Sequence, residues 1–222
     1  MDRNSCNQPP FSVARSIKSA SRSLCGVFAF RGGSVAFESS LERDFLRRMD
    51  FRTDVLDVVS QPLSLNFTAR NGRLYTYTPD YLVTFHSHVE LRPMLVEVKP
   101  EDTWREHWRD FLPKWKAAWR YAQQREWDFH IYDESRIRGQ SLKNIQTLER
   151  YRQADYDAVD LNAIIETVAL KGIATMQYLV ALHFQGQEAL GQSHVLHLIA
   201  IRQLDCDITG TLNGSLEVVL AS

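Results

Sequence analysis

Two short segments constrain the fold of this chain more than any other feature. They are Thr78-Pro79-Asp80-Tyr81-Leu82-Val83 and Val96-Glu97-Val98-Lys99-Pro100. Residues 81–85 are rich in aromatic and β-branched side chains, which favour a strand. Residues 96–99 alternate apolar with charged side chains, so Glu97 and Lys99 share one face of a second strand. A hairpin through residues 86–93 then brings Asp80 opposite the Glu97/Lys99 end, and two carboxylates and an amine meet at one corner of a sheet.

This set of side chains matches the chemistry of a magnesium-dependent nuclease. Mg²⁺ prefers oxygen ligands, and a nearby lysine supplies a fixed positive charge or a proton-handling amine beside an attacked phosphate. Each fragment alone has a more common structural explanation. Pro-Asp usually forms a turn, and an acidic residue near a lysine usually pairs across a solvated strand face. The order of the fragments on adjacent strands, with a helix carboxylate upstream, favours the nuclease interpretation.

That upstream carboxylate is Glu42. Residues 37–49 have the spacing of an amphipathic helix, in which Glu42 shares the inward face with Phe45 and Met49. A carboxylate on such a face needs a partner or a metal. However, Ser39-x-x-Glu42 is also a capping box, which explains Glu42 without any chemistry. The residues alone leave both interpretations open.

Composition indicates a soluble globular protein without a uniformly basic surface. The 222 residues suffice for one large or two small domains, with 44% hydrophobic and 24% charged residues and a net charge of -1. DNA binding would therefore need locally segregated charge. Cys6, Cys25 and Cys206 lack metal-ligand spacing and indicate a reducing compartment. No apolar run is long enough to span a membrane, and no secretory signal is recognisable. We expect a cytoplasmic protein.

Two segments do segregate positive charge. Residues 1–35 form a basic N-terminal arm that includes Arg15, Lys18 and Arg22, which either orders on phosphate or serves as a solvating tail. Residues 103–126 form a helix that Pro113 kinks or splits. On this helix Trp104, Trp108, Trp115 and Trp119 are expected in the core. A parallel basic stripe could follow a DNA backbone or be a solvated face, and it consists of Arg105, Arg109, Lys116 and Arg120.

The order of elements predicts two domains. A helix, a strand meander, the acidic hairpin, a helix, a strand and a further helix give an α/β core over residues 36–143. Residues 144–222 follow with helices at 158–170, 174–184 and 187–202, then a hairpin of residues 206–211 and 215–220, which is typical of a winged helix. The third of these helices carries little positive charge, so we expect protein docking rather than reading of a DNA groove.

Several ordered motifs together resemble the TnsA family, the endonuclease subunit of heteromeric transposases. The resemblance covers most of residues 36–150. It rests on Phe37-Glu38-Ser39-x-Leu41-Glu42-Arg43-Asp44-Phe45, Gln61-Pro62-Leu63, Tyr77-Thr78-Pro79-Asp80-Tyr81-Leu82-Val83, Val96-Glu97-Val98-Lys99-Pro100, Trp127-Asp128-Phe129-His130-Ile131 and Asn144-Ile145-x-x-Leu148.

The resemblance implies a restriction-endonuclease-like fold, with a mixed sheet flanked by helices. It implies a catalytic set of Glu42, Asp80, Glu97 and Lys99, in which the three carboxylates bind Mg²⁺ or, in its place, Mn²⁺. Glu42 occupies the Leu-Glu position of the family motif, which favours its catalytic interpretation over capping.

The resemblance also implies a reaction and its partners. The substrate would be transposon-end DNA cut at its 5′ ends, while a DDE-type transposase, TnsB, cuts and joins the 3′ ends. An AAA+ regulator, TnsC, would contact the C-terminal part, and the protein would associate with the nucleoid when bound to DNA. Two alternatives remain: a stand-alone restriction or repair nuclease, and a non-catalytic adaptor that keeps a nuclease-like core.

Overall fold

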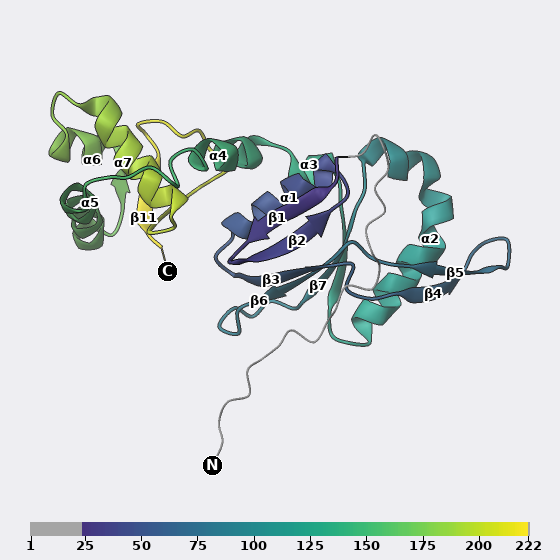
Figure 1. The fold of residues 1–222 in the computed structure, drawn as a ribbon. Coiled ribbons are helices and arrows are strands. Elements are labelled where there is room, and N and C mark those ends of the chain that lie inside the picture. Colours follow the sequence, from purple (N-terminus) through teal and green to yellow (C-terminus); the bar gives the residue numbers. More distant parts are fainter. Residues whose placement is uncertain (1–23, 222) are drawn as a thin grey trace, which may run out of the picture. The chain divides into compact units, whose positions relative to one another are not determined.

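The computed structural model describes residues 24–221 and divides the chain after Ile137 into two compact units (Figure 1). The predicted boundary lay after residue 143. The chain divides earlier because helix α4 (Gln140–Leu148) packs against helix α7 (Glu188–Ala200) of the second unit. The predicted basic residues Arg15, Lys18 and Arg22 lie outside the described residues.

The first unit is built on a four-stranded mixed sheet with the strand order β3-β6-β7-β8. Strand β6 runs antiparallel to both β3 and β7, whereas β8 runs parallel to β7. These strands are β3 (Val55–Ser60), β6 (Tyr81–Phe85), β7 (Met94–Val98) and β8 (Asp128–Tyr132). Tyr81 lies opposite Val96 and Leu82 opposite Leu95. The predicted hairpin between the two key segments is therefore confirmed.

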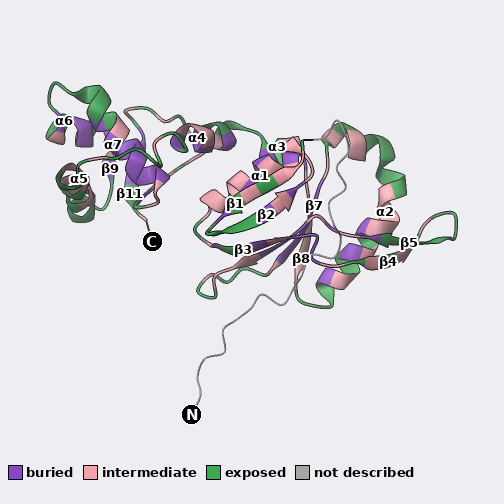
Figure 2. Cartoon of the chain, in the orientation of Figure 1, coloured by how far each residue is buried: buried purple, intermediate pink, exposed green. Residues whose placement is uncertain are grey.

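Different elements cover the two faces of this sheet (Figures 1 and 2). Helix α1 (Ser40–Phe51) packs through Phe45 on the face that carries Val83 and Val96. Helix α2 (Glu101–Gln123) packs through Trp115 on the face of Leu82 and Leu95, beside the hairpin of β4 (Leu65–Thr68) and β5 (Leu74–Tyr77). Because side chains alternate along a strand, Glu97 falls on the α2 face with Leu95, and Lys99, one residue past the end of β7, continues the same alternation.

The core begins earlier than residue 36. Strands β1 (Gly26–Phe30) and β2 (Gly33–Phe37) form an antiparallel hairpin, and Phe30, Val35 and Phe37 are buried with the α1 side of the core. The predicted N-terminal arm is thus wrong for its last ten residues, 26–35. The physical reason is apolar burial: these aromatic and β-branched side chains join the core once Gly32, with φ of 84°, allows the chain to turn.

Helix α2 bends, but not at the predicted place. Its non-helical residue is His107, upstream of Pro113, which lies within the helix. The predicted tryptophan core also holds only in part. Trp115 is buried and Trp104 packs against the same cluster. Trp108 and Trp119 are 43% and 53% exposed. The bend at His107 separates Trp104 from the other three tryptophans, and of those three it is Trp115 that joins the buried cluster on the sheet.

The second unit contains helices and a three-stranded antiparallel sheet with the order β10-β11-β9. Its remaining elements are α5 (Ala158–Lys171), β9 (Ala174–Thr175), α6 (Met176–His183), β10 (Leu204–Cys206) and β11 (Glu217–Leu220). Residues 174–175 were expected to begin a helix but form a strand against β11, because Thr175 is the N-cap of α6 and accepts a hydrogen bond from the Tyr178 N–H.

Across residues 24–221, every helix is too short or too polar to cross a bilayer. The short helix α3 (Glu134–Ile137) ends the first unit.

Candidate active site

Asp80 is fixed to the edge of strand β7 by two hydrogen bonds. Its backbone N–H donates to the Val96 carbonyl oxygen at 3.0 Å, and its Oδ2 accepts from the Val98 N–H at 2.7 Å. The preceding residue, Pro79, has a φ angle fixed by its ring, which restricts the backbone just before Asp80. Burial, followed by the negative charges of Glu97 and Glu42, raises the pKa of Asp80 well above its ordinary value. The site therefore concentrates more negative charge around Asp80 than the surrounding protein neutralises.

Glu97 lies deep in the same site and is held by two side chains. It is only 3% exposed. Its Oε1 accepts from Lys114 Nζ at 2.7 Å, and its Oε2 accepts from the Tyr77 hydroxyl at 2.6 Å. Lys114 Nζ also lies 4.6 Å from the centre of the Tyr77 ring and 4.7 Å from that of Phe111. A buried carboxylate needs such a partner, and Lys114 is the cation that meets this need.

The sequence did not single out Lys114. It comes from helix α2, three residues after Phe111 and four before Ala118, and both of these belong to the cluster on the α2 face of the sheet. The sequence does contain one indication of its role, which is that Lys114 occupies an inward-facing position of an amphipathic helix. A charge at such a position needs a buried partner. Tyr77 was missed as well. Its pKa is raised well above the ordinary value by burial and by the charges of Glu97 and Asp80, so its hydroxyl stays a proton donor.

Lys99 follows directly after strand β7. Its backbone N–H donates to the Tyr132 carbonyl oxygen at 2.9 Å, which continues the pairing with β8 past the end of the strand. Its ammonium lies 5.4 Å from the centre of the Phe111 ring. The side chain thereby points to the α2 side of the sheet, as its alternation with Glu97 predicts.

Glu42 approaches from helix α1, which covers the opposite face. The capping box predicted as an alternative is present in its serine half: Ser39 Oγ accepts from the Glu42 N–H at 3.1 Å and donates to Glu42 Oε1 at 2.9 Å, whereas the return bond from the carboxylate goes to the Glu38 amide in place of the Ser39 amide. Glu42 Oε2 accepts from the Glu38 N–H at 2.8 Å and from the Tyr81 hydroxyl at 3.2 Å. Burial raises the pKa of Glu42 despite these hydrogen bonds. Glu42 is therefore a capping residue whose carboxylate also adds charge near Asp80.

Removing the cap should weaken the protein measurably. We expect Ser39→Ala to lower the free energy of unfolding by about 1 kcal/mol, because the Glu42 N–H loses its acceptor and the Glu42 carboxylate loses a donor. Urea unfolding at neutral pH measures the change. Ser39→Thr keeps the hydroxyl and should stay close to wild type. Equal stability of the Ala variant and wild type would show that the cap contributes nothing.

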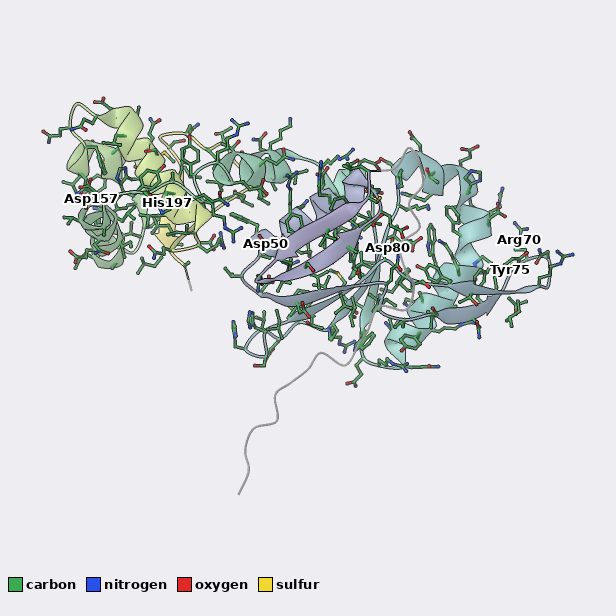
Figure 3. The ribbon with its side chains drawn as sticks, in the orientation of Figure 1. Asp50, Arg70, Tyr75, Asp80, Asp157 and His197 are labelled. Atoms are coloured by element: carbon green, nitrogen blue, oxygen red, sulfur yellow. The ribbon has the colours of Figure 1, made fainter. Side chains whose placement is uncertain are left out.

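One cavity brings the four predicted catalytic residues together. It has a volume of about 590 Å³ and opens between the β4–β5 hairpin, strand β7 and helix α2. Figure 3 shows Asp80 at the sheet, with Tyr75 on the neighbouring hairpin. The cavity is lined by the four predicted catalytic residues and by the two side chains that hold Glu97. These six residues are Glu42, Asp80, Glu97, Lys99, Lys114 and Tyr77. The predicted DNA-binding residues Arg105, Arg109, Lys116 and Arg120 do not line this cavity, and Arg105 pairs with Glu101 at 2.5 Å.

Gln61 is a further polar residue at the site. It has a φ of 48°, which is unusual for a residue with a side chain and is often found at functional sites. Its N–H donates to the Asp80 carbonyl oxygen at 2.7 Å, and its Nε2 donates to Glu38 Oε1 at 3.0 Å. Within the described part of the chain, its buried Oε1 has no hydrogen-bond partner. A small cavity of about 10 Å³, roughly the room that one water needs, lies among Glu38, Glu42, Gln61 and Asp80.

The carboxylates suit a hard cation, although they are not clustered as a metal site. Among residues 24–221, no three His, Cys, Asp or Glu side chains come together closely enough to form one. Glu42 comes from the opposite face and is held by its cap, and Glu97 is turned toward Lys114. Even so, each carboxylate oxygen retains acceptor capacity, and the raised pKa of Asp80 is the sign of a site that a cation would stabilise. The donor atoms are thus of the kind that Mg²⁺ prefers, and binding would require Glu97 to turn from Lys114.

The fold and the candidate site together indicate the class of protein. A mixed sheet flanked by helices, with Asp80, Glu97 and Lys99 at the ends of neighbouring strands, fits a restriction-endonuclease-like core. Residues 52–134 match the family described as "TnsA-like endonuclease N terminal". This match supports the predicted resemblance to the TnsA family over residues 52–134. The matched segment contains Asp80, Glu97 and Lys99, whereas Glu42 lies before it. A TnsA-like domain implies a nuclease of the transposase type, within a Tn7-type system that has partner proteins. A comparison with curated proteins gave no match.

Proposed function

We propose that this protein is a metal-dependent DNA endonuclease that cuts the 5′ ends of a transposon by phosphodiester hydrolysis. It would act in complex with a DDE-type transposase of the TnsB kind. The observation that carries the proposal is the cavity that Asp80, Glu97 and Lys99 share inside the family-matched segment. An adaptor without catalysis has no need for two carboxylates and two lysines around one cavity.

Each residue has a distinct role in the proposed reaction. Asp80 and Glu97 would hold Mg²⁺, for which Mn²⁺ can substitute, and the cation when bound supplies an activated water and charge stabilisation. Glu42 adds negative charge on the far side of Asp80. Lys99 faces the cavity and stabilises the charge that develops on the phosphate. Lys114 positions Glu97 by holding its Oε1 and places a positive charge beside this buried side chain.

The second unit is proposed to be a winged-helix domain that docks partner proteins. What supports this is the order of its elements: a helix, a short strand, two helices and two strands that close a small antiparallel sheet. In helix α7, His194 and His197 are buried and so do not face a DNA groove. Leu170 and Val159 of helix α5 are 88% and 74% exposed, which suits contact with a protein such as a TnsC-type regulator.

Strand-resolved cleavage of a transposon-end duplex tests the reaction. The chain is assayed with Mg²⁺, with and without a co-expressed DDE-type transposase subunit, and compared with Lys99→Gln. We expect 5′-end cleavage in the complex and a loss of about 100-fold or more in the variant. Lys143→Gln, a surface change in the second unit, should cut normally. Cleavage by the chain alone would indicate a stand-alone nuclease. Equal cleavage by wild type and Lys99→Gln would contradict the assigned site.

A further inference from the structure

A second groove lies beside the catalytic cavity and has a different chemistry. It has a volume of about 650 Å³ and runs between helix α2 and the β4–β5 hairpin. The two elements are in contact, and Figure 3 shows Arg70 on the loop of this hairpin. The groove and the catalytic cavity share Phe67, so one opens beside the other.

Among the described residues, the charged side chains that line this groove are all cations and none is Asp or Glu. The four cations, all of them exposed, are Arg70, Arg109, Lys116 and Arg120. In the region spanning residues 24–221, these four cations make no ion pair with a carboxylate. Four like charges placed side by side repel one another, which is unfavourable unless an anion occupies the space between them.

The rest of the lining suits a sugar–phosphate chain. Asn66 and Thr68 add groups that can contact phosphate oxygens, and Leu112, Pro113 and Leu74 provide apolar surface. Trp108 is 43% exposed, and the Arg109 guanidinium lies 5.0 Å from the centre of its ring. Most of the polar side chains in the groove are of the kind that contact phosphates of a nucleic-acid backbone. The groove is therefore suited to binding DNA of any base sequence.

We propose that this groove binds the backbone of the duplex that flanks the cleaved bond on one side. The inference rests on the proposed function, because a phosphodiester chain with one phosphate at Asp80 and Glu97 continues past Phe67 into the groove. The groove is a positioning site: it holds the substrate and takes no part in the reaction. Three of the four residues were predicted from the helix pattern as a basic stripe. Arg70 and the hairpin wall come from the structure, and Arg105 is excluded because it pairs with Glu101.

The salt dependence of DNA binding tests the proposal without any cleavage. The full chain, free of divalent cations, is titrated onto a fluorescent duplex with long flanks at increasing KCl concentration. We compare wild type with the double variant Arg109→Gln/Lys116→Gln. Each lost phosphate contact lowers the slope of log K against log salt by about 0.9, so the slope should fall by about 1.8. The matched control is Arg105→Gln/Arg125→Gln, which removes the same charge outside the groove and should keep the wild-type slope.

Shortening the duplex provides the second measurement. Removing one flank should weaken wild-type binding and leave the groove variant almost unaffected, because the variant has already lost contact with that flank. An equal effect of truncation on both proteins, an unchanged slope in the groove variant or no duplex binding by wild type would overturn the proposal.

Asp80→Asn separates the groove assignment from the proposed endonuclease function. If it abolishes cleavage while groove variants bind as wild type, only the groove assignment fails. If the groove variants lose slope but no cleavage occurs under any condition, only the proposed function fails.

Discussion

Asp80→Asn is expected to abolish cleavage and at the same time to stabilise the metal-free protein. Loss of the carboxylate removes a proposed metal ligand, and a loss of at least about 100-fold in rate is expected. The stability should change in the opposite direction, because the half-buried carboxyl of Asp80 has its pKa raised by desolvation and by the charges of Glu97 and Glu42. The amide oxygen of Asn can still accept the hydrogen bond from the Val98 N–H. The variant thus removes repulsion and keeps the local structure.

The stability of the metal-free protein should also depend on pH in a way that differs between wild type and Asp80→Asn. The pKa of Asp80 is raised in the folded state, so its contribution to stability is fully present below its ordinary pKa of 3.8 and is lost as pH rises through the folded value. Glu42, whose pKa is raised from 4.5, acts with the same sign. The metal-free wild type should therefore lose stability as pH rises across this window, and the Asn variant should lose less.

Thermal unfolding in EDTA over a pH series, together with cleavage in Mg²⁺, measures both effects. Asp110→Asn removes an exposed carboxylate from helix α2 and serves as the matched control. It should cut at the wild-type rate and keep the wild-type pH profile. A melting temperature of Asp80→Asn below that of wild type at neutral pH would contradict the account of charge at this site, whatever happens to cleavage.

Lys114→Met should destabilise the protein by about 3 kcal/mol at neutral pH. The change leaves the buried carboxylate of Glu97 without its ion-pair partner, and only the Tyr77 hydroxyl remains bonded to it. Breaking a buried pair from one side is costly because an uncompensated charge stays behind. The double variant Lys114→Met/Glu97→Gln should recover most of this loss, since no buried charge remains.

Urea unfolding of the four corners of this cycle measures the coupling between Lys114 and Glu97. Lys116→Met, two residues along the same helix and exposed, should change stability by less than about 0.5 kcal/mol. Saturating Mg²⁺ should narrow the gap between Lys114→Met and wild type, because a cation at Glu97 replaces the missing ammonium. Additive single and double variants would show that the two side chains do not interact in solution.

Residue alternation was enough to predict the centre of the fold. The pattern of Val96 to Lys99 placed Glu97 and Lys99 on one face, and the strand propensity of residues 81–85 placed Asp80 opposite them. The structure has this pairing. These predictions succeeded because strand periodicity and a short connection are local properties of the sequence.

The parts that were missed depend on contacts between distant segments. Lys114 meets Glu97 only after helix α2 packs across the sheet, and nothing near residue 114 in the sequence specifies that partner. Gln61 has a left-handed backbone and bonds through its N–H to Asp80, which lies just before a different strand of the chain. Residues 26–35 were assigned to a polar arm from the overall charge of residues 1–35, although Phe30 and Val35 are buried. Composition averaged over a segment conceals such a change within it.

Helix α2 carries Lys114 at its inward face and Arg109 and Lys116 at the basic groove. The counter-ion of Glu97 and two of the proposed contacts to a nucleic-acid backbone therefore lie on one helix. If DNA binds in the groove as proposed, a shift of this helix would also change the separation between the Lys114 ammonium and Glu97. Release of Glu97 for the proposed metal would then depend on whether a duplex occupies the groove as well as on the concentration of free cation.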